Sequence, residues 1–285
     1  MIKSIQLQGD GMLEKAMQYA KEAGYRHISL GFGSSKAFHA DDWKDYIKNV
    51  QELLNKNDLV CMQTHLPYYH LLISCEQLEE SMETAIKRCI EASAMLGAEF
   101  CVYHPRSSVD FDYDAERALD VNHRVISEYI TCAENAGTRL AIENMPLFPN
   151  VKQWNFYCAD YRELITLYDS FHNKNLGVCW DFGHGHLACQ ERELNHVEAI
   201  KAVGSRICCT HVHDNSGRDD DHLVPCAGES KISWEQVIPA LMRTGYPGAL
   251  TLELALKDSP VLADYMRHSY ACVNYLEKIA KGNNL

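Results

Sequence analysis

Residues 177–184 read Gly-Val-Cys-Trp-Asp-Phe-Gly-His, an apolar run that stops at the carboxylate of Asp181. Short apolar runs of this kind are typical of strands that are buried on both faces of a parallel sheet. A carboxylate directly after such a strand needs a metal or a salt bridge, because its unpaired burial costs several kcal/mol. The stretch therefore predicts a buried parallel strand with a polar site at its carboxyl end.

The same unit, a short strand-like run followed by a helical pattern, repeats along the whole chain. Apolar residues recur at helical spacing in residues 13–23, 115–136 and 260–279, for example. Glycine follows several of these helices, as at Gly24 and Gly137, where a left-handed residue commonly ends a helix. The expected strands are 4–7, 27–30, 59–64, 100–103, 140–142, 177–180, 207–210 and 249–252.

Eight strand-helix units in sequence indicate parallel strands that are joined by helical crossovers, and eight strands close a barrel. A doubly wound open sheet is the competing α/β fold, but it normally carries a glycine-rich nucleotide-binding turn after its first strand. Here that turn is Gln-Gly-Asp-Gly at residues 8–11, which lacks the fingerprint. We therefore predict one (β/α)8 TIM barrel domain over residues 1–285.

Charge and composition restrict the class of protein. The formal net charge is -12 and no basic run is present, which argues against nucleic acid and a membrane surface as partners. Residues 1–7 lack the apolar stretch of a signal peptide, and no run approaches the ~20 apolar residues of a membrane-spanning helix. The twelve cysteines form no Cys-x-x-Cys pair, and many lie in apolar runs, so we expect reduced thiols and a cytoplasmic location.

Ionisable residues end six consecutive predicted strands. In a closed barrel these ends converge on one rim, where carboxylates and imidazoles suit Zn, Mn and related divalent ions. One such residue alone is more simply explained as a cap or a salt bridge. Six consecutive strands that end in such residues are hard to explain in that way. The strand ends are His65, His104, Glu143, Asp181, His211 and Glu253, and His184, His213, Asp220 and His222 follow closely after strands six and seven.

These motifs resemble the xylose-isomerase-like barrels, a superfamily shared by sugar isomerases, ketose 3-epimerases and endonuclease IV. The resemblance covers nearly the whole chain and is most specific at residues 142–144, 180–184 and 211–234. The last segment departs from the family pattern at Cys226, where the family usually has Gly, and keeps Gly228, Ile232 and Trp234. Barrels of this family often pair, so the resemblance also makes a homo-oligomer an expectation.

The epimerase branch implies one divalent ion, held by four residues that match Glu143, Asp181, His211 and Glu253. The two glutamates there act as acid and base on either face of the substrate, while the metal polarises a carbonyl and its neighbouring hydroxyl. This predicts a metal-dependent isomerase or epimerase of a small sugar or sugar phosphate. The expected substrate-binding residues are His184, His104, Arg106, His213 and Arg218, the last lying one position later than the family's arginine.

The endonuclease IV branch implies a different chemistry. It uses nine ligands for three zinc ions, and clustered metals of this kind stabilise the attacking and leaving oxygens of a phosphoester cleavage. The alternative is therefore a multinuclear zinc hydrolase of a small phosphoester, and a barrel that binds sugar or metal without turnover is a third possibility. One to three ions of Zn, Mn, Co or Mg are expected. The nine matching residues are His65, His104, Glu143, Asp181, His184, His211, Asp220, His222 and Glu253.

Several aromatic side chains are candidates for an apolar wall against a sugar ring. Loop or core packing explains them equally well, and core packing is the simpler interpretation for Trp180. The candidates are Tyr68, Tyr69, Phe148, Trp154 and Trp180.

Overall fold

The computed structural model describes residues 1–9, 11–33, 36–68, 79–107, 114–148, 156–227 and 231–282. Eight parallel strands form one sheet in the order β7-β6-β5-β4-β3-β2-β1-β8. Tyr69, Trp154 and Gly228 lie outside the described residues. The strands are β1 (Ile2–Gln8), β2 (His27–Gly31), β3 (Val60–His65), β4 (Phe100–Tyr103), β5 (Arg139–Glu143), β6 (Leu176–Asp181), β7 (Ile207–His211) and β8 (Ala249–Leu252).

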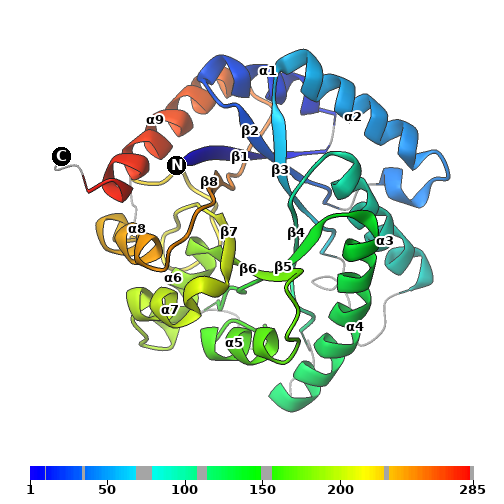
Figure 1. Ribbon diagram of the computed structural model, residues 1–285. Coiled ribbons are helices and arrows are strands. Elements are labelled where there is room, and N and C mark those ends of the chain that lie inside the picture. Colours follow the sequence, from blue (N-terminus) through cyan, green and yellow to red (C-terminus); the bar gives the residue numbers. More distant parts are fainter. Residues whose placement is uncertain are drawn as a thin grey trace.

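The first and last strands of this order, β7 and β8, lie next to each other. The Val212 N–H donates to the Thr251 carbonyl at 2.8 Å, and the Glu253 N–H donates to the Val212 carbonyl at 3.1 Å. These bonds bring the sheet into a nearly closed barrel, seen with its helices outside the ring of strands in Figure 1. The predicted (β/α)8 fold is confirmed.

Helices follow the strands and cover the outside of the barrel. The two longest are α4 and α9, and α9 packs against α1, so the end of the chain adjoins its beginning (Figure 1). The helices are α1 (Leu13–Ala23), α2 (Trp43–Asn57), α3 (Glu80–Met95), α4 (Ala115–Ala136), α5 (Tyr161–Asp169), α6 (Phe182–Glu191), α7 (His196–Val203), α8 (Trp234–Arg243) and α9 (Leu262–Ala280), with 3₁₀ turns η1 (Lys36–His39) and η3 (Gly204–Arg206).

The local sequence explains where these elements form and end. Helix α1 buries Leu13, Ala16, Met17 and Ala20, which lie at the i, i+3, i+4, i+7 spacing of one helical face. It ends at Gly24, whose φ of 114° is left-handed, as the sequence predicts. Strands β4, β6 and β8 are buried along their whole length, as expected of parallel strands covered on both faces.

The described part of the chain contains eleven of the twelve cysteines. The eleven cysteines described there are all free. None of the described helices combines the length and hydropathy that crossing a bilayer requires.

Candidate metal centre

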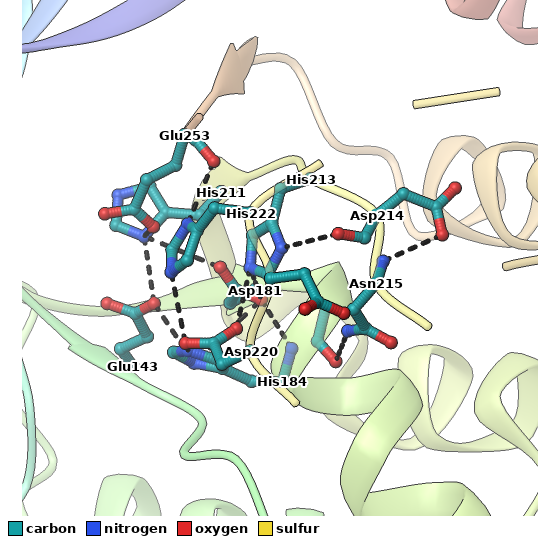
Figure 2. Close-up of polar contacts among 12 residues, drawn as sticks. Glu143, Asp181, His184, His211, His213, Asp214, Asn215, Asp220, His222 and Glu253 are labelled. Atoms are coloured by element: carbon teal, nitrogen blue, oxygen red, sulfur yellow. Dashed lines mark hydrogen bonds and ion pairs between the residues drawn. The ribbon is translucent and has the colours of Figure 1, made fainter. Parts of the chain in front are cut away.

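The ionisable strand ends meet at one mouth of the barrel. Figure 2 shows their side chains converging from β5, β6, β7 and β8 and from the loop after β7. Three groups, of which two share Glu143 and His211, could each hold one cation, because within each group the ligand atoms all lie within 4.8 Å of one another. The groups are His65, Glu143 and His211; Glu143, Asp181, His211 and Glu253; and His184, His213, Asp220 and His222.

Glu143 lies between His65 and His104, which lie at the ends of two neighbouring strands, and His211 of the second group. Its Oε2 lies 3.1 Å from His104 Nε2 and 3.3 Å from His65 Nε2, while its Oε1 lies 2.9 Å from His211 Nδ1. The side chain is fully buried. Its two oxygens therefore face two different sets of candidate ligands, so this carboxylate could contribute one oxygen to each of two cations.

The hydrogen bonds of the imidazoles fix the direction of their lone pairs. His65 and His184 each place Nδ1 2.8 Å from a main-chain carbonyl, and His222 does so at 3.0 Å. A carbonyl only accepts, so Nδ1 carries the hydrogen and Nε2 carries the lone pair of the neutral ring. The Nε2 atoms of His184 and His222 both face an acceptor, Asp220 Oδ2. His65 Nε2 lies 3.0 Å from His104 Nε2, which can donate to it in one tautomer of His104.

A nitrogen lone pair directed at a carboxylate oxygen is repelled by it unless a proton or a metal ion lies between the two atoms. Histidines that bind metals commonly donate their other ring N–H to a carbonyl, as three of these do. The donor set, imidazole nitrogen with carboxylate oxygen, suits zinc or manganese. The residues present therefore fit divalent cations.

Asp181 owes its position to the junction between β6 and α6. It ends the strand and caps the helix, with its Oδ1 accepting from the His184 N–H at 2.6 Å. Residue three of the helix, His184, is thereby brought over the same mouth. The other oxygen, Oδ2, is buried without a hydrogen-bond partner among the described residues, which is costly unless a cation neutralises it.

Electrostatics keep the carboxylates ionised. Burial raises the pKa of Glu143, but His211 and His104 outweigh it and hold this pKa well below its usual value. The pKa values of Asp181 and Glu253 are likewise lowered by neighbouring histidines against the effect of burial. Burial lowers the pKa of His104 and favours its neutral form. Anionic carboxylates and a neutral imidazole are the states that bind metal.

Above these groups lies a pocket of about 310 Å³. Glu253 reaches it with 12% of its side chain exposed, whereas Glu143 and Asp181 are fully buried and do not line it. Lysine and arginine are absent from the described residues that line the pocket. These are Gln6, Gln8, Gly31, Gly33, His65, Tyr68, His104, His184, Asp220, His222, Glu253, Leu254 and Ala255.

Comparison with known proteins shows the family to which the chain belongs. A sequence model of the xylose isomerase-like TIM barrel family matches residues 17–270. The chain belongs to this family. An uncharacterized protein of Methanocaldococcus jannaschii, MJ1311, is 30% identical over 243 residues, which are 81% of this chain and 80% of that protein.

Two solved structures share the fold over nearly the whole chain. A D-tagatose 3-epimerase-like protein superposes with a TM-score of 0.77 at 23% identity, covering 99% of both chains. The D-psicose 3-epimerase of Clostridium cellulolyticum H10, crystallised with D-tagatose, has a TM-score of 0.72 at 13% identity and covers 98% of this chain and 99% of its own. At these identities the likeness establishes the fold alone.

The usual family glycine is replaced in this chain by Cys226, and the backbone there explains the preference. Cys226 has a φ of 63°, in the left-handed region that glycine adopts without a steric penalty. The chain therefore places a non-glycine residue in a backbone conformation that favours glycine.

Arg106 has a different environment from the one we expected. Its guanidinium donates to the hydroxyls of Tyr103 at 3.2 Å and Tyr129 at 3.1 Å, and also to the Glu83 carboxylate. The side chain is buried and does not line the pocket. This environment favours a structural role for Arg106 over the expected substrate contact.

Two other expected substrate contacts also lie outside the pocket lining. Arg218 is exposed on the loop after β7. His213 is fully buried and joins His184, Asp220 and His222 in the third ligand group, so its surroundings are those of a ligand. His104 and His184 do line the pocket.

The aromatic candidates divide between pocket and packing. Tyr68 lines the pocket and is 42% exposed. Trp180 is buried in the core, and Phe148 lies with its ring centroid 6.1 Å from that of Phe156.

Gln6 is a site residue that the sequence interpretation missed. Its Nε2 donates to Glu253 Oε1, and its Oε1 accepts from the Ser29 hydroxyl at 3.0 Å. Gln6 thus orients the only carboxylate of the second group that reaches the pocket. The signal in the sequence was a polar residue between Ile5 and Leu7, inside an apolar strand.

Proposed function

We propose that this chain is a metal-dependent isomerase or epimerase of a small sugar, working by proton transfer. The observation that carries the proposal is the ligand group of Glu143, Asp181, His211 and Glu253 beneath a pocket that Glu253 enters. The structural neighbours named as sugar 3-epimerases add support.

A divalent cation bound by these four residues would polarise a carbonyl and its neighbouring hydroxyl, which lowers the cost of an enediolate. Glu253 is the proposed base, because its carboxylate is ionised and reaches the pocket. Its Oε1 accepts from Gln6 and its Oε2 lies 3.1 Å from His211 Nδ1, so both oxygens are held in place. Glu143 remains the proposed second proton-transfer group.

The pocket lining favours a sugar without phosphate. A volume of about 310 Å³ is at the small end of small-molecule sites, so it suits a monosaccharide. The described lining offers amides and imidazoles for hydroxyl groups and the exposed ring of Tyr68 for a sugar face, but no cationic side chain for a phosphate.

Proton exchange tests this function directly. Metal-free protein would be reconstituted with Mn, Co, Zn or Mg and incubated with ketopentoses and ketohexoses in deuterated water, with C–H loss followed by NMR. Metal-dependent exchange is expected, and Glu253→Gln should slow it about 10²- to 10⁴-fold, the usual contribution of a general base. Absence of exchange for every ketose and metal would reject the proposal.

A multinuclear zinc hydrolase of a small phosphoester is the second candidate. The observation that favours it is the bridging position of Glu143, which a one-metal isomerase does not require. Two or three zinc ions per chain and cleavage of a model phosphodiester would support it, whereas one ion and ketose exchange would support the isomerase. If neither reaction occurs in metal-loaded protein, a binding function remains.

A further inference from the structure

A separate pocket lies on the outside of the barrel, where the turn before α8 meets α8 and α9 (Figure 1). Its volume is about 380 Å³, and its described lining shares no residue with the pocket at the barrel mouth. Two thiols, an imidazole and a carboxylate line it, and lysine and arginine are absent from its described lining. These four groups belong to Cys226, Cys272, His268 and Glu235. Such a donor set without a cationic side chain suits a metal ion.

Helix α9 presents a pair of ligand atoms to this pocket. His268 and Cys272 lie one helical turn apart, at i and i+4, so they share one face of the helix. Cys272 Sγ lies 3.8 Å from His268 Nε2. Bonds of about 2.3 Å to sulfur and about 2.0 Å to nitrogen separate two ligands of one tetrahedral zinc ion by about 3.5 Å. The pair therefore has nearly the spacing that a shared ion requires.

The turn before α8 adds a second thiol to the same pocket. Cys226 is exposed, and its φ of 63° lies in the left-handed region, where glycine has no steric penalty. Its side chain is not part of the buried core. Neither the backbone nor the core thus explains a cysteine at this position, whereas a ligand role does. Rotation of the exposed side chain would bring Cys226 Sγ toward the pair on α9.

The charges around the thiols favour a cation. Partial burial and the neighbouring Cys272 raise the pKa of the Cys226 thiol. The carboxylates of Asp214 and Glu235 raise it further, to about 12. Tyr275 donates to Glu235 Oε1 at 2.9 Å and so holds this carboxylate in the pocket wall. A bound cation would compensate these negative charges and displace the thiol protons.

We propose that Cys226, His268 and Cys272 bind one zinc ion on the outside of the barrel. Thiolate and imidazole are the ligands of structural zinc sites, whereas hard cations such as Mg²⁺ prefer oxygen. The fourth position is open to water or to the Glu235 carboxylate. The ion would join the turn before α8 to α9. The proposal goes beyond the proposed function, because this site shares no ligand with the three groups at the barrel mouth.

Cadmium, which binds thiolates as zinc does, reports this site selectively. A thiolate bound to cadmium gives an intense ultraviolet charge-transfer band, and the ligand groups at the barrel mouth contain no cysteine. Titration of the metal-free protein, kept reduced by a phosphine, should produce this band and saturate it at one bound cadmium ion. Cys226→Gly and Cys272→Ser should each weaken the band and lower the affinity of this site for cadmium by about tenfold or more. His268→Ala should lower the affinity while both thiolates still contribute to the band.

The chain offers two controls for these variants. Cys226→Gly places the residue that the backbone favours at a φ of 63°, so loss of the band there does not arise from unfolding. Cys132→Ser is the matched control, since Cys132 is also a partly exposed thiol on a long helix, α4, but lines a different groove. It should leave the band and the affinity unchanged. Circular dichroism of each variant verifies its fold.

Zinc analysis after equilibrium dialysis supplies a second readout. Cys226→Gly should retain one zinc ion fewer per chain than the unchanged protein, whether or not ketose exchange occurs. The zinc content of this variant then counts the ions at the barrel mouth alone. The inference fails if cadmium produces no thiolate band, or if Cys226→Gly and Cys272→Ser keep the band and the zinc content of the unchanged protein. Unchanged cadmium affinity in His268→Ala would overturn the proposed ligand set.

Discussion

Asn144 holds the main chain of Asp181 with both ends of its amide. Its Oδ1 accepts from the Asp181 N–H at 2.7 Å, and its Nδ2 donates to the Asp181 carbonyl at 2.9 Å. Both residues are buried. The carboxylate that carries an unpartnered oxygen at the centre of the site is thus fixed by the residue that follows Glu143.

Replacement of this amide should affect both stability and metal binding. Asn144→Ala leaves two buried main-chain groups without partners, so we expect a loss of about 2–4 kcal/mol in the free energy of unfolding. Because Asp181 is then less well oriented, metal affinity should fall about 10- to 100-fold. Urea unfolding of the metal-free protein and metal titration measure the two effects.

Asn122 supplies a matched control for this experiment. Its amide bonds the main chain of Arg106 in the same two-ended way, with both distances 2.7 Å, but outside the ligand groups. Asn122→Ala should therefore cost similar stability and leave metal affinity unchanged. Equal losses of metal affinity in the two variants would show that Asn144 acts only through stability.

Metal removal should make stability fall with rising pH. Burial lowers the pKa of His211, but Glu143 and Glu253 outweigh it and raise the value to about 10; for His222, Asp220 likewise prevails over burial and raises it to about 10. A raised histidine pKa stabilises the folded state fully below the unfolded value of about 6.5 and stops doing so as pH rises through 10.

We therefore expect the melting temperature of the metal-free protein to fall between pH 6.5 and 10. Zinc must displace those protons, so the rise in melting temperature that it causes should grow over the same range. Scanning fluorimetry with chelator or zinc measures both trends. A melting temperature that increases with pH in the chelator would contradict the assigned histidine environments.

Replacement of the buried Arg106 should lower the stability of the protein and leave substrate binding unchanged. Arg106→Met removes the cation beside the Glu83 carboxylate and one hydrogen bond from each of two tyrosine hydroxyls, although Tyr129 still donates to Glu83, so the free energy of unfolding should fall by about 2–4 kcal/mol. The Arg106→Met/Glu83→Met double variant should recover part of this loss. Metal content and the KM for a substrate should not change. If stability is unchanged and the KM is much higher, Arg106 contacts the substrate, as the sequence suggested.

Asp181 and Arg106 show which features of the site can be predicted from the sequence and which cannot. An ionisable residue after an apolar strand is a local pattern, and barrel closure then brings such residues to one rim, so their convergence could be anticipated, whereas the place of His213 in a ligand group could not. Arg106 also follows a strand, but its direction depends on Glu83, 23 residues away on another element. The pairing of Gln6 with Glu253 spans 247 residues and arises only when β1 adjoins β8. The direction of a side chain and its distant partners depend on how the elements pack, and the periodicity of the sequence does not specify that packing.

Gln6 should influence the proton transfer of Glu253 without binding the metal. Gln6→Leu removes the donor to Glu253 Oε1 and frees this carboxylate, so we expect the exchange rate to fall about tenfold with metal content unchanged. Gln6→Glu places a second carboxylate beside Glu253, which raises the pKa of Glu253 and moves the acidic limb of the pH–rate profile to higher pH.

Gln8→Leu is the control, because Gln8 lines the same pocket. It should change KM but leave the acidic limb in place. If both variants at position 6 keep the rate and the pH profile of the unchanged protein, Gln6 does not position the base, and the orientation of Glu253 depends on the cation and His211.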